Sequence, residues 1–200
     1  MIIGHYAAAL IPHSYFKKVP LWYFLVVANL PDFLWMTLAL LGIEETKPQH
    51  FWQASFDRIQ VQMLYSHDLL PGLFLALVVA LLTFLFFKRG IIALVSAALI
   101  LLHHVADWVS GFPHYWMGPG SLELGWGLYY REPYLALVLE ALFASALVFL
   151  YLKLEARHGR PKSRAYQLKL YLLFILGSLM WLPTARYSMS ELYQFFVSHT

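Results

Sequence analysis

Residues 94–108 read LVSAALILLHHVADW, an apolar run that ends in ionisable side chains. Two further apolar stretches are interrupted in the same way: LWYFLVVANLPDFLWMTLALLG over residues 21–42 and YSHDLLPGLFLALVVALL over residues 65–82. An ionisable group in hydrocarbon costs about 3 kcal/mol or more unless it is paired, hydrated or bound to a metal. These three stretches therefore predict both a bundle of membrane helices and a polar site assembled inside it.

The composition is that of an integral membrane protein. Of the 200 residues, 60% are hydrophobic and 12% are charged, and the mean hydropathy is +0.62. The absence of Cys excludes disulfides, thiolate metal sites and Cys nucleophiles. The pI of about 9.0 does not indicate nucleic-acid binding, because the positive charge is concentrated in loops. Residues 1–16 contain no Lys or Arg, so we expect no cleavable signal peptide.

Hydrophobic stretches of about 18 residues or more can cross a bilayer, and they define the predicted fold. We expect an all-α fold, a polytopic membrane helix bundle that forms one integral membrane domain over residues 1–200. The segment 1–16 is too short to span and is predicted to be a re-entrant or half-inserted helix. The tail 188–200 is predicted to be an interfacial amphipathic piece. The five predicted transmembrane helices are 19–42, 67–87, 91–109, 133–152 and 168–186.

The distribution of Lys and Arg predicts the orientation of the bundle. Ten of the 14 basic residues lie near residues 17–18, 88–89 and 153–169, all on one side of the membrane. The four on the opposite side are Lys47, Arg58, Arg131 and Arg186. The positive-inside rule places the more basic side in the cytoplasm. We therefore expect the N-terminal side and the basic loops to be cytoplasmic and the C-terminus to be outside.

Counting residues from the cytoplasmic boundaries places several ionisable side chains at similar depths. With a helical rise of about 1.5 Å per residue, the depths are about 18 Å for His5, about 21 Å for Asp32, about 20 Å for His103 and Glu140, and about 26 Å for Asp107. His67 lies farther in, at about 30 Å, and needs a tilt or a bend to join them. The layer lies between the middle of the bilayer and its outer edge.

Histidine and aspartate side chains are the ligands of zinc and other divalent catalytic metals. His103 and Asp107 are four residues apart, so they share a helix face and can hold one ion. The alternative is a buried His–Asp hydrogen bond that joins helices. Asp32, His67 and His5 complete the predicted metal-ligand set, with His5 included only if segment 1–16 is re-entrant. We expect one or two divalent ions, with zinc as the first choice and manganese or magnesium as alternatives.

Further ionisable residues are candidates for catalysis or substrate binding. Asp68 and Glu140 are candidate general bases. Asp68 is equally a candidate ligand, ligand-orienting group or helix-start residue, and Glu140 can instead be a metal ligand or pair with a basic residue. His114 is a candidate to close over a substrate. Arg186 is a candidate anion-binding residue, with snorkelling to the interface as the alternative.

The order of these residues resembles a known family. The segments in question are His5 with the small residues that follow it, Leu30-Pro31-Asp32, Ser66-His67-Asp68-Leu69-Leu70 and His103-x-x-x-Asp107. They are similar, over residues 1–152, to the motifs of the bacterial membrane-bound metal-dependent hydrolases, a family thought to be distantly related to the zinc-dependent phospholipases C. The chain departs from that pattern at Asp68, where Ser is usual, after Asp32, where Asp-His is absent, and at Gly111, where some relatives have His.

The resemblance implies a hydrolase of the bacterial inner membrane that acts on a lipid or lipid-linked substrate near the outer leaflet, through metal-activated water. A phosphoester is the first expectation, and an acyl ester or amide is the next. Two other classes stay open. One is a small cation or proton transporter that uses the same His/Asp site, and the other is a non-catalytic membrane subunit. A transport pathway should reach both sides, whereas the cytoplasmic halves of the predicted helices are nearly free of ionisable residues.

Overall fold

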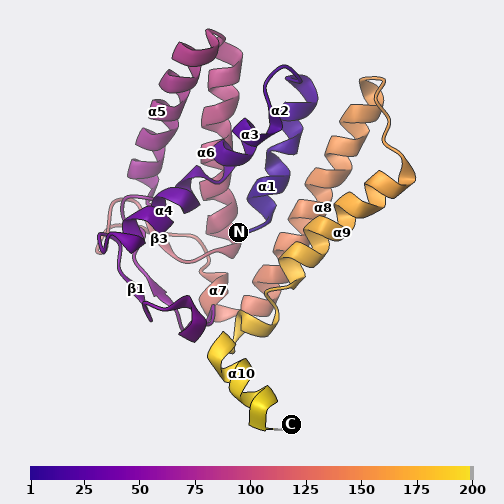
Figure 1. Cartoon of the computed structure of the whole chain (residues 1–200). Helices are drawn as coiled ribbons and strands as arrows, with labels where there is room; N and C mark the ends of the chain where they lie inside the picture. The colour runs from indigo at the N-terminus through magenta and orange to yellow at the C-terminus, as the bar shows by residue number, and fades with distance from the viewer. Residues whose placement is uncertain (199–200) are drawn as a thin grey trace.

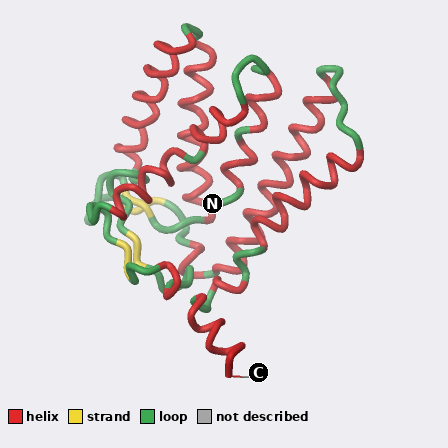
Figure 2. The backbone as a smooth tube through the Cα atoms, viewed as in Figure 1, coloured by secondary structure: helices red, strands yellow, loops and turns green. Residues whose placement is uncertain are grey.

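The computed structural model describes residues 1–198, which are mostly helical (Figures 1 and 2). Residues 199–200, the end of the predicted tail, lie outside the described part. The long helices are α5 (Leu69–Phe87), α6 (Gly90–Ser110), α8 (Pro133–Arg157) and α9 (Arg164–Leu179). Within the described residues, four helices are long and apolar enough to cross a membrane, or five spans are present if the bent pair α3 (Leu21–Ala28) and α4 (Leu30–Leu40) counts as one. The prediction of an all-α membrane bundle is confirmed.

Two helical hairpins frame the molecule, α5 with α6 and α8 with α9, and α1 to α3 lie between them (Figure 1). Helix α5 ends at Phe87, and the next residue, Lys88, adopts a left-handed φ of 54° and turns the chain into α6. Helix α8 begins at Pro133, whose fixed φ suits the first helical turn. Ser163 caps α9 by accepting a hydrogen bond from the Tyr166 amide. Helices α8 and α9 both extend beyond the predicted ranges on the basic side.

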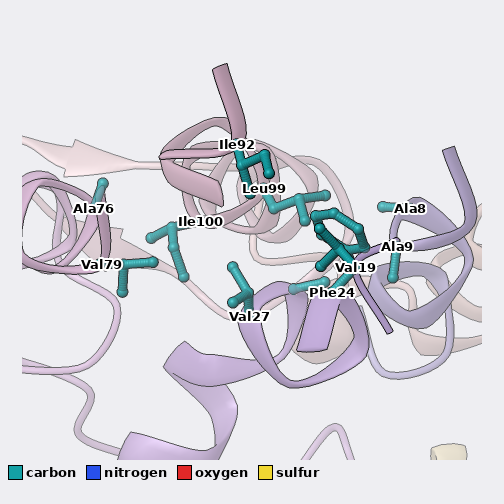
Figure 3. Close-up of a cluster of buried hydrophobic side chains, with 11 residues drawn as sticks. Ala8, Ala9, Val19, Phe24, Val27, Ala76, Val79, Ile92, Leu99 and Ile100 are labelled. Carbon is teal, nitrogen blue, oxygen red and sulfur yellow. The ribbon is translucent and has the colours of Figure 1, made fainter. Parts of the chain in front are cut away.

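The N-terminal segment forms two short helices, α1 (Gly4–Ala8) and α2 (Leu10–Tyr15), that pack against α8. Ala7 and Ala9 are fully buried there, because small side chains allow helices to approach closely. Ala8 and Ala9 join Val19 and the apolar faces of α3, α5 and α6 in the cluster drawn in Figure 3. The segment is therefore part of the bundle core, which is the condition under which His5 can reach the polar site.

The predicted helix 19–42 is broken into α3 and α4, which are bent by 57°. Pro31 accounts for the break, because proline has no N–H and its ring excludes the carbonyl four residues earlier. The Asn29 side chain lies at the junction and donates to the Leu25 carbonyl at 2.8 Å. Carbonyl groups at the end of α3, including that of Ala28, are therefore available to side chains of other helices.

The longer loops, which carry the strands, lie at one end of the bundle, opposite the α2–α3, α5–α6 and α8–α9 connections (Figure 2). They contain two antiparallel two-stranded sheets, β1 (Thr46–Lys47) with β2 (Gln60–Val61), and β3 (His114–Tyr115) with β4 (Glu123–Leu124). The same end carries the short helices η1 (Phe51–Gln53), α7 (Leu128–Arg131) and η2 (Pro183–Ala185). Helix α10 (Met189–Ser198) extends away from the bundle (Figure 1). It coincides with the predicted tail 188–200, and its interfacial role stays a prediction.

Gly72 of α5 packs closely against His104 of α6, and Gly72→Ala tests this packing. A Cβ at this position would lie 2.3 Å from Nε2 of the buried His104 ring. We expect the variant to lose about 1–3 kcal/mol of stability through overpacking, measured by thermal unfolding in detergent. Gly90→Ala is the matched control, because a Cβ there meets no atom within 4 Å. Equal stability of the two variants would contradict the prediction.

Candidate metal centre

Four of the five predicted metal ligands converge at one point in the bundle. Asp32 comes from α4, His67 from the turn before α5, and His103 and Asp107 from one face of α6. Each offers one ligand atom, and these four atoms all lie within 4.8 Å of one another. We call these four residues the His/Asp cluster.

The spacing of the His/Asp cluster fits the coordination sphere of a small divalent cation. Nε2 of His103 lies 3.2 Å from Nε2 of His67 and 3.3 Å from Oδ2 of Asp107. Nε2 of His67 lies 3.4 Å from Oδ1 of Asp32 and 3.5 Å from Oδ2 of Asp107. A tetrahedral zinc ion with bonds of about 2.0–2.1 Å would place its ligand atoms roughly 3.3–3.5 Å apart. The donor set of two imidazoles and two carboxylates also suits zinc or manganese.

The bend between α3 and α4 orients His103. Its Nδ1 donates to the Ala28 carbonyl at 2.8 Å, and a carbonyl can only accept. In the neutral ring Nε2 is then unprotonated, so its lone pair faces the cluster. The Pro31 break thus has a consequence for the site, because it supplies the carbonyl that fixes this tautomer.

A chain of hydrogen bonds holds Nδ1 of His67, so that its Nε2, like that of His103, faces the cluster. Oγ of Ser66 donates to Oε2 of Glu44 at 2.8 Å, and Nδ1 of His67 lies 2.9 Å from the same Oγ. Because the hydroxyl hydrogen is committed to Glu44, Ser66 accepts from Nδ1–H of His67. In their neutral forms both histidines therefore turn unprotonated Nε2 atoms towards each other, an arrangement that a shared cation would stabilise.

His5, the fifth predicted ligand, lies directly beside the cluster. Its Nε2 donates to Oδ1 of Asp107 at 3.1 Å, and its ring stacks on His103 with centroids 3.6 Å apart. The amino group of Met1 contacts the same carboxylate oxygen. Oδ1 of Asp107 is thus held by the N-terminal segment, whereas Oδ2 faces the imidazoles.

One side of the cluster opens into a cavity. The Asp32 side chain is 31% exposed, whereas His67 and His103 are almost fully buried. The cavity has a volume of about 490 Å³ and is lined by Asp32, His67, Asp107 and His114, together with mainly apolar residues. A substrate group in this cavity would meet the cluster from the Asp32 side.

His114, the candidate to close over a substrate, lines the cavity beside His67. Its ring stacks on His67 with centroids 5.3 Å apart, and neither ring nitrogen has a hydrogen-bond partner within the described residues. Burial lowers the pKa of His114 well below its usual value, so the ring is neutral. A neutral imidazole that lines the cavity can donate or accept one hydrogen bond from a bound molecule.

Asp68 and Glu140, the candidate general bases, make contacts that hold other segments in place. Asp68 accepts from the Tyr115 and Gly118 amides at 2.8 and 2.6 Å, which fixes the loop that carries His114. Glu140 accepts from the backbone amides of Ile2, Ile3 and Gly4 and from the Tyr129 hydroxyl. The structure does not place either carboxylate in the four-residue cluster.

Arg186, the candidate anion-binding residue, lies apart from the cavity lining. Its guanidinium group lies 5.6 Å from the centroid of the Tyr134 ring. Its main-chain carbonyl accepts from Arg58 at 2.8 Å.

Glu44 is the functional candidate that the sequence analysis missed. Its carboxylate is buried and also accepts from the Tyr65 and Ser66 amides at 2.6 and 3.0 Å. The neighbouring Glu45 is exposed and pairs with Lys47 at 2.9 Å. No pattern in the sequence separates two consecutive glutamates in a loop, so only the folded chain identifies Glu44 as the residue that orients His67.

We expect Glu44→Gln to weaken divalent-metal affinity by about 10–100-fold, because outer-shell partners of ligating histidines contribute on this scale. A glutamine can donate to Ser66 and so permit the wrong His67 tautomer. The affinity is measured by competition with a chromophoric chelator. Glu45→Gln is the matched control and should bind metal like the wild type. Unchanged affinity of the Glu44 variant would rule out the orienting role.

Comparison of the chain with protein-family models, curated proteins and solved structures gives no match. The resemblance to the membrane-bound metal-dependent hydrolases therefore rests on the sequence motifs.

Proposed function

We propose that this protein is a membrane-embedded, metal-dependent hydrolase that cleaves an ester bond of a lipid or lipid-linked substrate. The observation that carries the proposal is the pair of Nε2 atoms of His67 and His103, oriented by Glu44–Ser66 and by the Ala28 carbonyl and facing two carboxylates. If the two histidines only held helices together, an N–H of one ring would face an acceptor atom of the other. Here two acceptor nitrogens converge.

In this proposal the His/Asp cluster holds the ion through Asp32, His67, His103 and Oδ2 of Asp107. A bound divalent cation lowers the pKa of its water towards neutrality and polarises an ester oxygen. His5 positions Asp107 by donating to its other oxygen. Asp32 borders the open side, so the reacting group is delivered next to it.

His114 is proposed to contact the substrate or the attacking water from the cavity wall, since both of its ring nitrogens lack a partner within the described chain. Asp68 is proposed to act by holding the His114 loop, and Glu140 by holding the N-terminal segment, and neither needs to transfer a proton. Zinc is the proposed ion, with manganese or magnesium as alternatives. We further propose a bacterial inner-membrane location with the basic loops in the cytoplasm and the cavity towards the outer leaflet.

The test is the metal content of the detergent-purified protein, measured by inductively coupled plasma mass spectrometry. We expect about one equivalent of zinc or manganese in the wild type, because one four-ligand group fits one ion. We expect its loss in Asp32→Ala, His67→Ala and His103→Ala, with each variant shown to be folded by size-exclusion chromatography. His50→Ala, at an exposed loop residue outside the four-residue cluster, is the control. A folded wild type that binds neither ion after incubation would overturn the proposal.

A further inference from the structure

The cavity beside the His/Asp cluster defines a substrate class, and this inference rests on the proposed function. We propose that the cavity binds a long hydrocarbon chain whose uncharged carboxyl ester lies at the cluster, so that the bond cleaved is the acyl ester of a membrane lipid rather than a phosphoester. The reaction is hydrolysis. The oxygen of water adds to the acyl carbon, the acyl C–O bond breaks and the leaving alcohol oxygen gains a proton, with no change of oxidation state.

The lining of the cavity matches a hydrocarbon chain. Away from the cluster the walls are formed by large apolar or aromatic side chains, including those of Phe33, Met36, Phe56, Met63 and Trp181. The volume of about 490 Å³ is within the range of pockets, about 300–1,000 Å³, that enclose a small-molecule ligand. Burial of an acyl chain against such walls is favourable, at about 0.8 kcal/mol for each CH₂ group.

The cavity is poor in groups that bind phosphate. No Lys, Arg, Asn or Gln is among its described lining residues. Two of its hydroxyl groups are committed elsewhere, because Ser55 donates to Asp57 at 2.7 Å and Thr184 donates to the Trp181 carbonyl at 3.0 Å. A phosphodiester brings charged oxygens that need several donors when water is excluded, and these residues do not provide them.

Two basic residues close in sequence to lining residues, Arg58 beside Ile59 and Arg186 two residues after Thr184, have other partners. The guanidinium group of Arg58 donates to Glu191 at 2.9 Å, and that of Arg186 lies against Tyr134. The Met1 amino group borders the cavity, but it contacts Asp107, so its charge is matched by that carboxylate. The arrangement of charge therefore favours an uncharged ester over an anionic phosphoester.

Two residues of the cavity lining, His114 and Trp181, carry buried ring nitrogens without partners within the described residues. These atoms are Nε1 of Trp181 and both ring nitrogens of His114. An imidazole carries at least one N–H in either protonation state, and an ester carbonyl oxygen can accept it. Unsatisfied buried polar groups are uncommon in folded proteins, and here they are explained if a polar ligand group enters the cavity.

The experiment uses the metal-loaded protein in nanodiscs that contain dipalmitoyl phosphatidylcholine, and it measures released palmitate and released phosphocholine separately. Palmitate release that is lost in His103→Ala supports the inference. Phosphocholine release without palmitate would overturn it while leaving the proposed function intact. Release of neither product by a metal-containing protein would count against both an acyl ester and a phosphoester of this lipid, and so against the inference. Absence of metal in the protein would defeat the proposed function itself.

A binding measurement on the metal-free protein tests the cavity independently of catalysis. Methyl 9,10-dibromostearate should quench tryptophan fluorescence saturably, because Trp35 and Trp181 line the cavity. Ala54→Phe places a bulky side chain on the cavity lining and should weaken this quenching at least tenfold. Ala98→Phe, an exposed position on α6 away from the lining, is the matched control. Equal quenching of the two variants would show that the chain dissolves in detergent or lipid rather than in the cavity.

Discussion

Asp107→Asn is expected to lower zinc affinity by more than about 100-fold. This loss of affinity exceeds the one expected for a residue that only orients a metal ligand. Asp107 is the most connected residue of the His/Asp cluster. Its Oδ2 lies 3.3 Å from Nε2 of His103 and 3.5 Å from Nε2 of His67, and its Oδ1 accepts from His5. The amide removes the negative charge and directs an N–H₂ group at acceptors or at the ion. The affinity is measured with a chelator of known strength, and ester hydrolysis should fall in parallel.

Asp57→Asn makes the same substitution outside the membrane helices and serves as the control, since Asp57 accepts from Ser55 in a loop. A variant that failed to fold would also lose metal, so size-exclusion behaviour and thermal unfolding are recorded for both proteins. A folded Asp107 variant with zinc affinity close to that of the wild type would show that the cluster is not the metal site. The His–Asp contacts would then be structural only.

The membrane helices could be predicted from the sequence because the signal is physical and local. A run of about 18 apolar residues has few stable alternatives to a spanning helix in a bilayer. The same reasoning could not predict the 57° bend at Asn29, because a proline in a membrane helix is compatible with either a kink or a break. Nor could it predict the packing of α1 and α2, which depends on whether Ala7 and Ala9 find a partner helix.

The convergence of the cluster followed from a simple constraint, namely that ionisable groups in hydrocarbon must find each other. The i, i+4 spacing places His103 and Asp107 on one face of α6, and their burial identifies that face as the inner one. Hydrogen-bond partners were beyond this reasoning. Glu44 orients His67 through Ser66, and the two residues are separated along the chain by a loop with no regular pattern. Side-chain contacts of this kind, between residues distant in sequence, appear only once the chain is folded.

Glu140→Ala is expected to destabilise the protein by at least about 3 kcal/mol, since each buried donor left unsatisfied costs about 1–3 kcal/mol. The carboxylate accepts from the Ile2, Ile3 and Gly4 amides and from the Tyr129 hydroxyl at 3.0 Å. These bonds fix the start of α1, the helix that presents His5 to Asp107. Unfolding in detergent, followed by circular dichroism, measures the loss.

Glu140→Gln separates anchoring from catalysis, because it keeps a similar shape and one acceptor oxygen while removing the base. If Glu140 is a general base, hydrolysis should fall by about 10²–10⁴-fold in a protein of nearly normal stability. If it is an anchor, as its hydrogen bonds indicate, stability should fall and the remaining folded protein should keep most of its activity and its metal. Glu132→Gln, at the exposed start of the same helix α8, is the control. A large loss of activity without a loss of stability would return Glu140 to the catalytic set, since an anchor acts only through the segment that it holds.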